Sequence, residues 1–423
     1  MDTATVKTEK TVFGGNTIAK IESKTVFIPY TMPDETLSIN IVQHKNDYDN
    51  AEILNIIKPS PHRINPPCKY YGICGGCNMM HIDPEYQREL RKTMLHDAFK
   101  NNKVNIPFEI ETVSGPDFNY RARFQLNDGG LSQKNSRNIV KIEKCLCAEE
   151  PVNEFLEAIN KTSVEAGKNS ENMNKIPCGR VHLFGSSFIE NDEKLKICDE
   201  NISEKNAATE KSVNKNRQFN KKYKQKENHY FAGTIISPEN TVTVNLNGKK
   251  LSFDVRGFFQ SNLFVFEKVL SLIQKLLPGG ENILDMYSGC GSISAFLADK
   301  YKNVTLVEHN RDALVFAEQN MAGTNHVSYG LSGAKWVQTC AQFAGTFDAC
   351  VIDPPRSGME KEVCDYLCKS KIPVILSMSC DPATQARDIA KLIKSGYELE
   401  RLFLLDFYPN TSHIESLALL VRT

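Results

Sequence analysis

The chain has 423 residues, of which 41% are hydrophobic, and its 51 basic and 51 acidic side chains give a formal net charge of zero. This length predicts two or three domains with cores of their own, and no apolar run of roughly 18 residues indicates a membrane span. The balanced charge neither requires nor excludes a nucleic-acid partner, because a local basic patch can suffice.

The first residues, Met1 to Lys7, are polar and lack the apolar stretch of a signal peptide, so we expect a cytoplasmic protein. The 13 cysteines are then expected to be free thiols, metal or cluster ligands, or catalytic groups rather than disulfides. We expect a monomer.

Residues 12–57 contain short strand-like segments separated by turn signals such as Gly14-Gly15-Asn16. Closely spaced short strands of this kind predict a small antiparallel barrel. An OB-like barrel over residues 1–60 is the natural candidate, and such barrels often bind oligonucleotides. A barrel used only as a docking module is the alternative.

A cysteine-rich loop follows at residues 68–81. Cys68, Cys74 and Cys77 are close in sequence, Gly75-Gly76 permits a tight wrap, and a fourth thiolate could come from Cys145 or Cys147. Four thiolates can hold structural zinc or a 4Fe–4S cluster. Zinc knuckles usually contain paired Cys-x2-Cys motifs, so three neighbouring cysteines and a distant fourth favour the cluster.

The rest of the segment 61–254 is predicted to form a small α+β domain. A helix is expected from Pro84 to about Asn101, and residues 108–147 are rich in strand-like segments. From about 199 to 228 the composition shifts to Lys, Asn, Glu and Ser, with eight basic residues and one acid between Lys205 and Lys226. Such a stretch cannot bury enough apolar surface to order itself, which favours a solvated insertion over an arm that grips RNA.

From residue 255 onward, apolar strands alternate with amphipathic helices. Strands are expected at 282–286, 304–308, 347–352 and 372–376, and helices at 311–321, 361–369 and 382–395. This alternation predicts an α/β domain with a mostly parallel, doubly wound, Rossmann-like sheet over residues 255–423.

The first of these strands leads into a glycine turn that contains Asp285, Tyr287, Gly289 and Gly291. Glycines there let a ligand approach the backbone at the start of the next helix. Glu308 ends the following strand, at the offset where an acid hydrogen-bonds ribose hydroxyls. The turn resembles motif I of S-adenosylmethionine-dependent methyltransferases.

Cys380 stands where an apolar run stops and Asp381-Pro382 begins a predicted helix. Open α/β sheets bind ligands at such strand ends, and the positive end of the helix is expected to lower the pKa of the thiol. Taken alone, Cys380 could instead be a small buried hydrophobic residue, as most free cysteines are.

Four motifs, in this order along the chain, resemble those of the RNA (uracil-5-)methyltransferase family. They are Phe258-Phe259-Gln260-Ser261-Asn262, Asp353-Pro354-Pro355-Arg356-Ser357-Gly358, Ser379-Cys380-Asp381-Pro382 and His413-Ile414-Glu415. The resemblance implies an enzyme that forms 5-methyluridine in RNA with S-adenosylmethionine as methyl donor, Cys380 as nucleophile and Glu415 as general base. It also implies that four residues contact S-adenosylmethionine or orient the uracil: Gln260, Tyr287, Glu308 and Asp353.

The chemistry explains these residue types. Uracil C5 attacks a sulfonium methyl group only weakly, and addition of a thiolate at C6 creates an enolate that is nucleophilic at C5. A base must then remove the C5 proton so that the thiolate can leave. His413 is expected either to assist or to position the loop that carries Glu415. Asp381 stands where the family usually has Asn, which keeps a helix-capping side chain but adds a charge that opposes thiolate formation.

The cysteine loop resembles that of the family branch with a 4Fe–4S cluster, which implies four ligands: Cys68, Cys74, Cys77 and Cys145. Together with a barrel of the TRAM type, it implies 23S ribosomal RNA as the substrate, with the tRNA T-loop as the alternative. A nucleic-acid N-methyltransferase would need only the Asp-Pro-Pro motif and would leave Cys380 and Glu415 superfluous. A methyltransferase fold used only as an RNA-binding module would not need Cys380, Glu308 and Glu415 intact.

Overall fold

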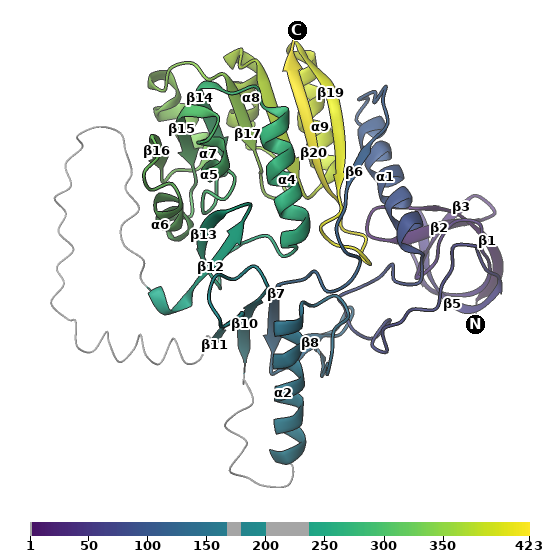
Figure 1. The fold of residues 1–423 in the computed structure, drawn as a ribbon. Helices are drawn as coiled ribbons and strands as arrows, with labels where there is room; N and C mark the ends of the chain where they lie inside the picture. Colours follow the sequence, from purple (N-terminus) through teal and green to yellow (C-terminus); the bar gives the residue numbers. More distant parts are fainter. Residues whose placement is uncertain (1, 167–178, 200–236) are drawn as a thin grey trace.

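The computed structural model describes residues 2–166, 179–199 and 237–423, and Figure 1 traces the chain through three regions. The predicted insertion at 199–228 begins at the last residue of a strand, Asp199, and its residues 200–228 lie outside the described residues. None of the described helices is both long and apolar enough to cross a membrane.

The N-terminal region is a closed five-stranded barrel, which confirms the predicted barrel, but β3 and β5 pair in parallel where the sequence predicted antiparallel strands throughout. Its strands, in the order in which they are hydrogen-bonded, are β1 (Thr3–Thr11), β2 (Asn16–Ile21), β3 (Lys24–Pro29), β5 (Tyr48–Lys58) and β4 (Thr36–His44). Alternate side chains point inward, so Val26 and Ile28 are buried whereas Phe27 between them is not. The sequence analysis missed β1 because its nine residues are mostly Thr, Lys and Glu, with Val6 as the main inward apolar side chain.

Among its described residues, the central region holds two α-helices and three small sheets. They are α1 (Pro84–Asn101), α2 (Glu150–Ala166), the sheet β11 (Leu195–Asp199), β10 (Arg180–Gly185) and β7 (Arg123–Asn127), the pair β8 (Leu131–Ser132) and β9 (Ile139–Val140), and the pair β12 (Thr241–Leu246) and β13 (Lys249–Asp254). A one-turn 3-10 helix, Pro238–Asn240, precedes β12. Helix α1 starts at the predicted residue because Asp83 Oδ1 accepts a hydrogen bond from Tyr86 N (3.0 Å) and Pro84 occupies the first turn.

The C-terminal region is built on an eight-stranded sheet. Its strands in spatial order are β16 (His326–Tyr329), β15 (Tyr301–Val307), β14 (Gly280–Met286), β17 (Ala349–Ile352), β18 (Val374–Ser379), β20 (Glu415–Arg422), β19 (Tyr397–Leu405) and β6 (Glu111–Val113). Strand β20 is antiparallel to both neighbours and the other pairs are parallel, which confirms the mostly parallel sheet. The edge strand β6 comes from the central region, which the sequence analysis did not anticipate.

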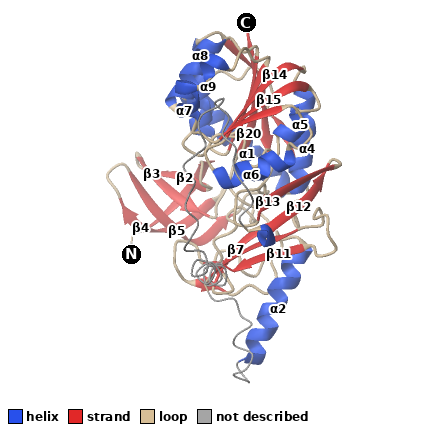
Figure 2. Cartoon of the chain, turned by 90° about the vertical axis from the view of Figure 1, so that its left-hand side faces the viewer, coloured by secondary structure: helices blue, strands red, loops and turns tan. Residues whose placement is uncertain are grey.

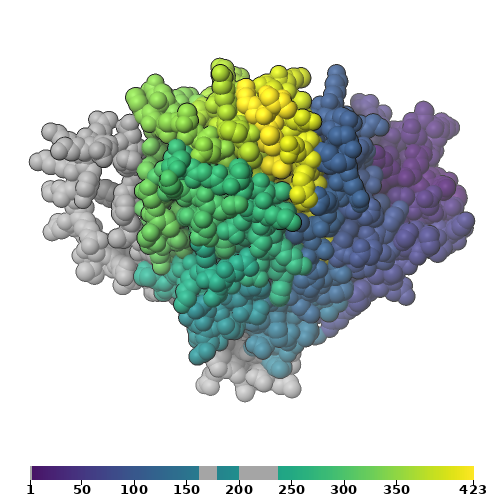
Figure 3. Space-filling view, turned by 45° about the horizontal axis from the view of Figure 1, so that its top comes forward, coloured from purple at the N-terminus to yellow at the C-terminus, as the bar shows by residue number. Residues whose placement is uncertain are grey.

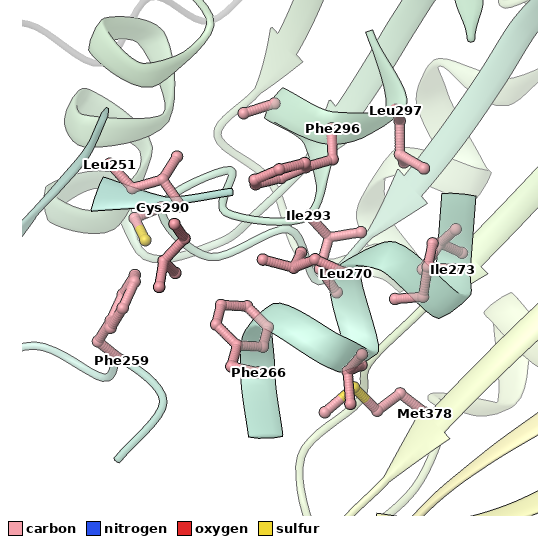
Figure 4. Close-up of a cluster of buried hydrophobic side chains, with 14 of the residues drawn as sticks. Leu251, Phe259, Phe266, Leu270, Ile273, Cys290, Ile293, Phe296, Leu297 and Met378 are labelled. Atoms are coloured by element: carbon pink, nitrogen blue, oxygen red, sulfur yellow. The ribbon is translucent and has the colours of Figure 1, made fainter. Parts of the chain in front are cut away.

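Helices cover both faces of this sheet (Figure 2). One face carries α4 (Leu263–Leu276), α5 (Ser294–Leu297) and α6 (Arg311–Asn320); the other carries α1, α7 (Gly333–Thr339), α8 (Lys361–Ser370) and α9 (Pro382–Lys394). A 3-10 turn, Ala341–Phe343, follows α7. Because side chains alternate along a strand, Leu376 packs in the first core and Ile375 in the second. Figure 4 shows the first core, where Phe266 and Leu270 of α4 lie near Ile293 and Phe296.

Helix α1 lies between the barrel and the last strands of the large sheet, as the space-filling view shows (Figure 3). It packs against α9 and β19 on one side. On the other side, Asp97 of α1 forms an ion pair with Lys10 of the barrel (2.5 Å). The three regions therefore meet around α1 and the loops beside it.

Candidate active site

The register of the large sheet brings Cys380 and Glu415 to the same edge. Ser379, the last residue of β18, pairs with Ser416 of the antiparallel strand β20, so the adjoining residues Cys380 and Glu415 face each other across the end of the sheet. The buried side chain of Gln385 fixes this edge: its Nε2 donates to Ser377 O (2.8 Å), and its Oε1 accepts from Ser416 Oγ (2.6 Å). Residues from two sequence motifs are thus neighbours in space.

The Cys380 thiol is half-buried, and burial together with the charges of Glu415 and Asp353 raises its pKa to about 11. The Arg356 guanidinium acts in the opposite direction. The net shift of the thiol pKa is therefore opposite to the sequence-based expectation, although the backbone hydrogen bond at Cys380 acts in the expected direction. Desolvation and two neighbouring carboxyl groups outweigh the backbone N–H groups.

The carboxyl groups beside Cys380 are also perturbed. Burial raises the pKa of Glu415 well above its usual range, with a further contribution from Asp353, while Arg356 lowers it. Burial alone raises the pKa of Asp353 to about 6. Perturbed carboxyl groups around a cysteine at a strand end are typical of a catalytic site. Arg356 belongs to the Asp-Pro-Pro-Arg motif, but the sequence analysis assigned it no role.

Asp381, the residue that departs from the family pattern, caps helix α9. Its Oδ1 accepts from Ala383 N (3.0 Å) and Thr384 N (2.9 Å), so the expected capping role is confirmed. The carboxylate is thereby turned toward the helix backbone.

The loop that follows Asp353 is tied to α9 and to the glycine turn. Asp388 of α9, which is buried, accepts from Met359 N (2.9 Å), and Thr384 Oγ1 donates to Arg356 O (3.2 Å). At the other end, Tyr287 Oη accepts from Glu360 N (3.2 Å). The sequence analysis did not predict that Asp388 holds this loop.

The glycine turn and Glu308 lie together at the ends of β14 and β15. Glu308 follows β15 directly, and its carboxylate accepts from Gly289 N (3.0 Å) and Asn310 N (2.6 Å). A Cβ added to Gly289 would meet nothing within 4 Å, so open space adjoins the backbone there. The buried atoms Gln260 Oε1 and Ser288 Oγ have no hydrogen-bond partner within the described part of the chain.

These features fit S-adenosylmethionine. Its ribose hydroxyls can donate to Glu308, which retains free lone pairs, and its polar atoms can satisfy the unpartnered oxygens of Gln260 and Ser288. Tyr287 has a positive φ of 65°, unusual for a residue with a side chain, which marks a constrained backbone at this turn.

The predicted cysteine ligands line one cavity of about 550 Å³, which also contains a fifth thiol, Cys147. Cys147 Sγ lies 3.7 Å from Cys77 Sγ, and Gly76 N donates to Cys74 Sγ (3.4 Å). Asn153 of α2 holds Cys145 by accepting from its N (2.9 Å) and donating to its O (3.1 Å). The sequence named Cys147 only as an alternative ligand, and the structure places it beside the others.

Within residues 2–166, 179–199 and 237–423, no three His, Cys, Asp or Glu side chains are arranged to hold a single metal ion. A cluster imposes a different spacing, because each thiolate binds a separate iron of the cube rather than one shared ion.

Known proteins match both the sequence and the fold. The family described as tRNA (Uracil-5-)-methyltransferase matches residues 341–423, and the methyltransferase small domain matches residues 268–368. An uncharacterized RNA methyltransferase of Treponema denticola is 35% identical over 98% of each chain. The 23S rRNA (uracil(1939)-C(5))-methyltransferase RlmD of Shewanella amazonensis is 27% identical, over 96% of this chain and 92% of its own length. The Pyrococcus abyssi tRNA (uracil-54, C5)-methyltransferase, solved with S-adenosyl-L-homocysteine, superposes with a TM-score of 0.71 over 98% of this chain at 20% identity.

Proposed function

The chain belongs to the RNA uracil-5-methyltransferase family, and we propose that it methylates C5 of a uridine in 23S ribosomal RNA by covalent catalysis with Cys380. The observation that carries this proposal is that the Ser379–Ser416 pair of β18 and β20 brings Cys380 and Glu415 to the same edge of the sheet, close enough for the charge of Glu415 to act on the thiol. A nucleic-acid N-methyltransferase needs neither group, and an RNA-binding module has no use for either.

In the proposed reaction, the Cys380 thiolate adds to C6 of uracil and shifts electron density to C5 and O4. S-adenosylmethionine, when bound, supplies the electrophilic methyl group that C5 attacks. Glu415 then takes the proton from C5, the C5–C6 double bond forms again, and the C6–S bond breaks as Cys380 leaves as a thiolate. The raised pKa of Glu415 suits this role, because a carboxylate of higher pKa is a stronger base.

We assign Gln260, Tyr287, Glu308 and Asp353 to the binding of S-adenosylmethionine or to the orientation of the uracil. Glu308 would bind the ribose, and Gln260 offers an unpartnered oxygen. Asp353, with a pKa of about 6, can exchange a proton near neutral pH and so hydrogen-bond the uracil edge as donor or acceptor.

The choice of 23S ribosomal RNA rests on the relatives named RlmD, which align with this chain over nearly its whole length, including the barrel and the cysteine loop. The similarity to the Pyrococcus abyssi structure concerns the fold, and a tRNA T-loop uridine remains the second candidate. We assign residues 1–60 to a barrel of the TRAM type, 61–254 to the central domain and 255–423 to the catalytic domain of a cytoplasmic, monomeric enzyme.

We further propose that Cys68, Cys74, Cys77 and Cys145 hold a 4Fe–4S cluster in the central domain. The four cysteines line one cavity, and the preference for a cluster over zinc rests on their spacing in the sequence. Protein purified without oxygen should be brown and contain iron and sulfide in equal amounts. A colourless preparation that is rich in zinc would overturn this assignment.

The target is tested by incubating the purified protein with S-adenosylmethionine and unmodified transcripts of 23S ribosomal RNA and of tRNA. Mass spectrometry should find 5-methyluridine at one position of the ribosomal transcript. Methylation of tRNA alone would favour the second candidate, and N-methylated bases would contradict the covalent reaction.

A further inference from the structure

The side chain of Asn78, which follows Cys77 directly, reaches from the cysteine loop to the segment that precedes Glu415. Asn78 Nδ2 donates to Ser412 Oγ (2.9 Å), and Asn78 Oδ1 accepts from Ser412 N (2.8 Å). Because the amide donates at one end and accepts at the other, the contact fixes both its orientation and the position of Ser412.

The backbone beside Asn78 strengthens the same link. The N–H groups of Asn78 and Met79 both donate to Asn410 O, at 3.2 and 3.0 Å. Residues 78–79 thus hold residues 410–412 through four hydrogen bonds. Strand β20 begins three residues after Ser412, at Glu415.

The turn of the barrel that contains Gly14 and Gly15 packs against this contact. Asn78 Nδ2 also donates to Gly14 O (3.1 Å). Gly15 has a φ of +83°, and a Cβ there would lie 2.5 Å from Asn78 Nδ2 and 2.9 Å from Ser412 Cβ. Only a residue without a side chain fits so close, so the barrel, the cysteine loop and the segment before Glu415 meet at Asn78.

We propose that Asn78 is a positioning residue for the general base: it sets the place of the Glu415 carboxylate through Ser412. This inference rests on the proposed function, since it assumes that Glu415 removes the C5 proton. In that step the C5–H bond breaks, the proton passes to the Glu415 carboxylate, and the C5–H electron pair forms the C5–C6 double bond. The C6–S electron pair leaves with Cys380. A displaced Glu415 slows this step and leaves the earlier addition and methyl transfer intact.

Asn78→Ala is therefore expected to lower multiple-turnover methylation about 10- to 100-fold, the range typical of a misplaced catalytic group. The rate of methyl transfer in a single turnover should stay within about threefold of the wild-type rate. The covalent protein–RNA adduct should accumulate and be visible on a denaturing gel with unmodified transcripts of 23S ribosomal RNA and of tRNA. Ser412→Ala removes the Oγ acceptor of the Asn78 Nδ2 hydrogen bond but keeps the Ser412 N–H that donates to Asn78 Oδ1, so it should show the same pattern to a smaller degree; it serves if Asn78→Ala fails to fold.

The matched control is Asn160→Ala. The Asn160 amide donates to Ile142 O (2.8 Å) and Leu156 O (2.7 Å) in the central region and does not contact residues 410–412. Its loss should lower stability without accumulation of adduct.

Unchanged turnover in the Asn78→Ala and Ser412→Ala variants, or a loss of turnover without adduct, would overturn the inference. Glu415→Gln separates the two proposals. If Glu415→Gln accumulates adduct and Asn78→Ala does not, only the role of Asn78 fails. If neither does, the assignment of Glu415 as base fails.

Discussion

The two segments that carry the proposed catalytic residues, 377–388 with Cys380 and 406–415 with Glu415, are held in place by different parts of the molecule. The first is fixed within the C-terminal region: Asp381 caps α9, and Asp388 accepts from Met359 N. The second is fixed largely from outside that region, by side chains of α1 and of the cysteine loop.

The contacts of the second segment show this dependence. Arg91 of α1 pairs with the fully buried Asp406 (2.7 Å), and Gln87 of α1 accepts from Asn410 N (2.9 Å). Asn78 binds Ser412 from the cysteine loop. The proposed nucleophile therefore belongs to the Rossmann-like sheet, whereas the segment that carries the proposed base contacts side chains from outside that region. If the proposed roles hold, completion of the reaction depends on how α1 and the cysteine loop dock against that segment.

The largest effect is expected at the nucleophile. Cys380→Ala should reduce methylation by several orders of magnitude, because no other group can add to C6, while binding of S-adenosylmethionine measured by calorimetry should persist. Cys368→Ala, a change at a half-buried thiol of α8 outside the site, is the matched control and should retain activity. Turnover by Cys380→Ala would rule out the covalent reaction.

Loss of the base should have a smaller effect of a different kind. Glu415→Gln keeps the size of the side chain but cannot accept the C5 proton, so turnover should fall about 10²- to 10⁴-fold. The protein–RNA adduct should then survive denaturation, as measured by gel shift. If turnover falls and no adduct forms, the two segments do not divide the reaction as proposed.

Much of the nucleophile side of this comparison could be predicted from the sequence, because it is local. The apolar run before Cys380, Asp381 at the helix start and the strand–helix alternation are all patterns of near neighbours. The base side depends on contacts such as Asn78 with Ser412, which are 334 positions apart. No periodicity marks such a pair, and the motif identified Glu415 without indicating what holds it.

Other features could not be predicted from the sequence, for similar reasons. Strand β6 joins the large sheet from the central region because its three residues pair with β19, and three residues are too few to show a pattern. The direction of the pKa of Cys380 depends on burial and on Glu415 and Asp353, none of which is adjacent in sequence. The helix start after Cys380 could be predicted from the sequence, but the burial and the two carboxyl groups that raise the pKa of the thiol could not.

The packing of α1 against the second segment can be weakened without a substitution at Cys380 or Glu415. Arg91→Met leaves the buried Asp406 with only Arg88 as its charged partner, and we expect the free energy of unfolding to fall by about 3 kcal/mol. Lys92→Met, which removes a cation paired with the exposed Glu89, should cost no more than about 1 kcal/mol. Urea denaturation monitored by circular dichroism gives both values. Equal losses would show that Asp406 contributes no more than a surface ion pair, and the dependence on α1 would then be wrong.

The smallest effect is expected at Asp381, and it tests the nucleophile segment alone. Asp381→Asn keeps an oxygen that can cap α9, so stability should fall by no more than about 1 kcal/mol, the loss of an anion at a helix N-terminus.

The same substitution, Asp381→Asn, also removes a negative charge one residue from Cys380. A negative neighbour disfavours the thiolate, so its removal should lower the pKa of the Cys380 thiol, by less than the contributions of Glu415 and Asp353 that raise it. The thiolate fraction at a given pH should then rise, and the alkaline rise in reactivity should move to lower pH. The rate of Cys380 alkylation by iodoacetamide, followed by peptide mass spectrometry across pH 7 to 10, measures this shift. An unchanged pH profile would mean that the cap already turns the Asp381 charge away from the thiol, and that Glu415 and Asp353 alone set its reactivity.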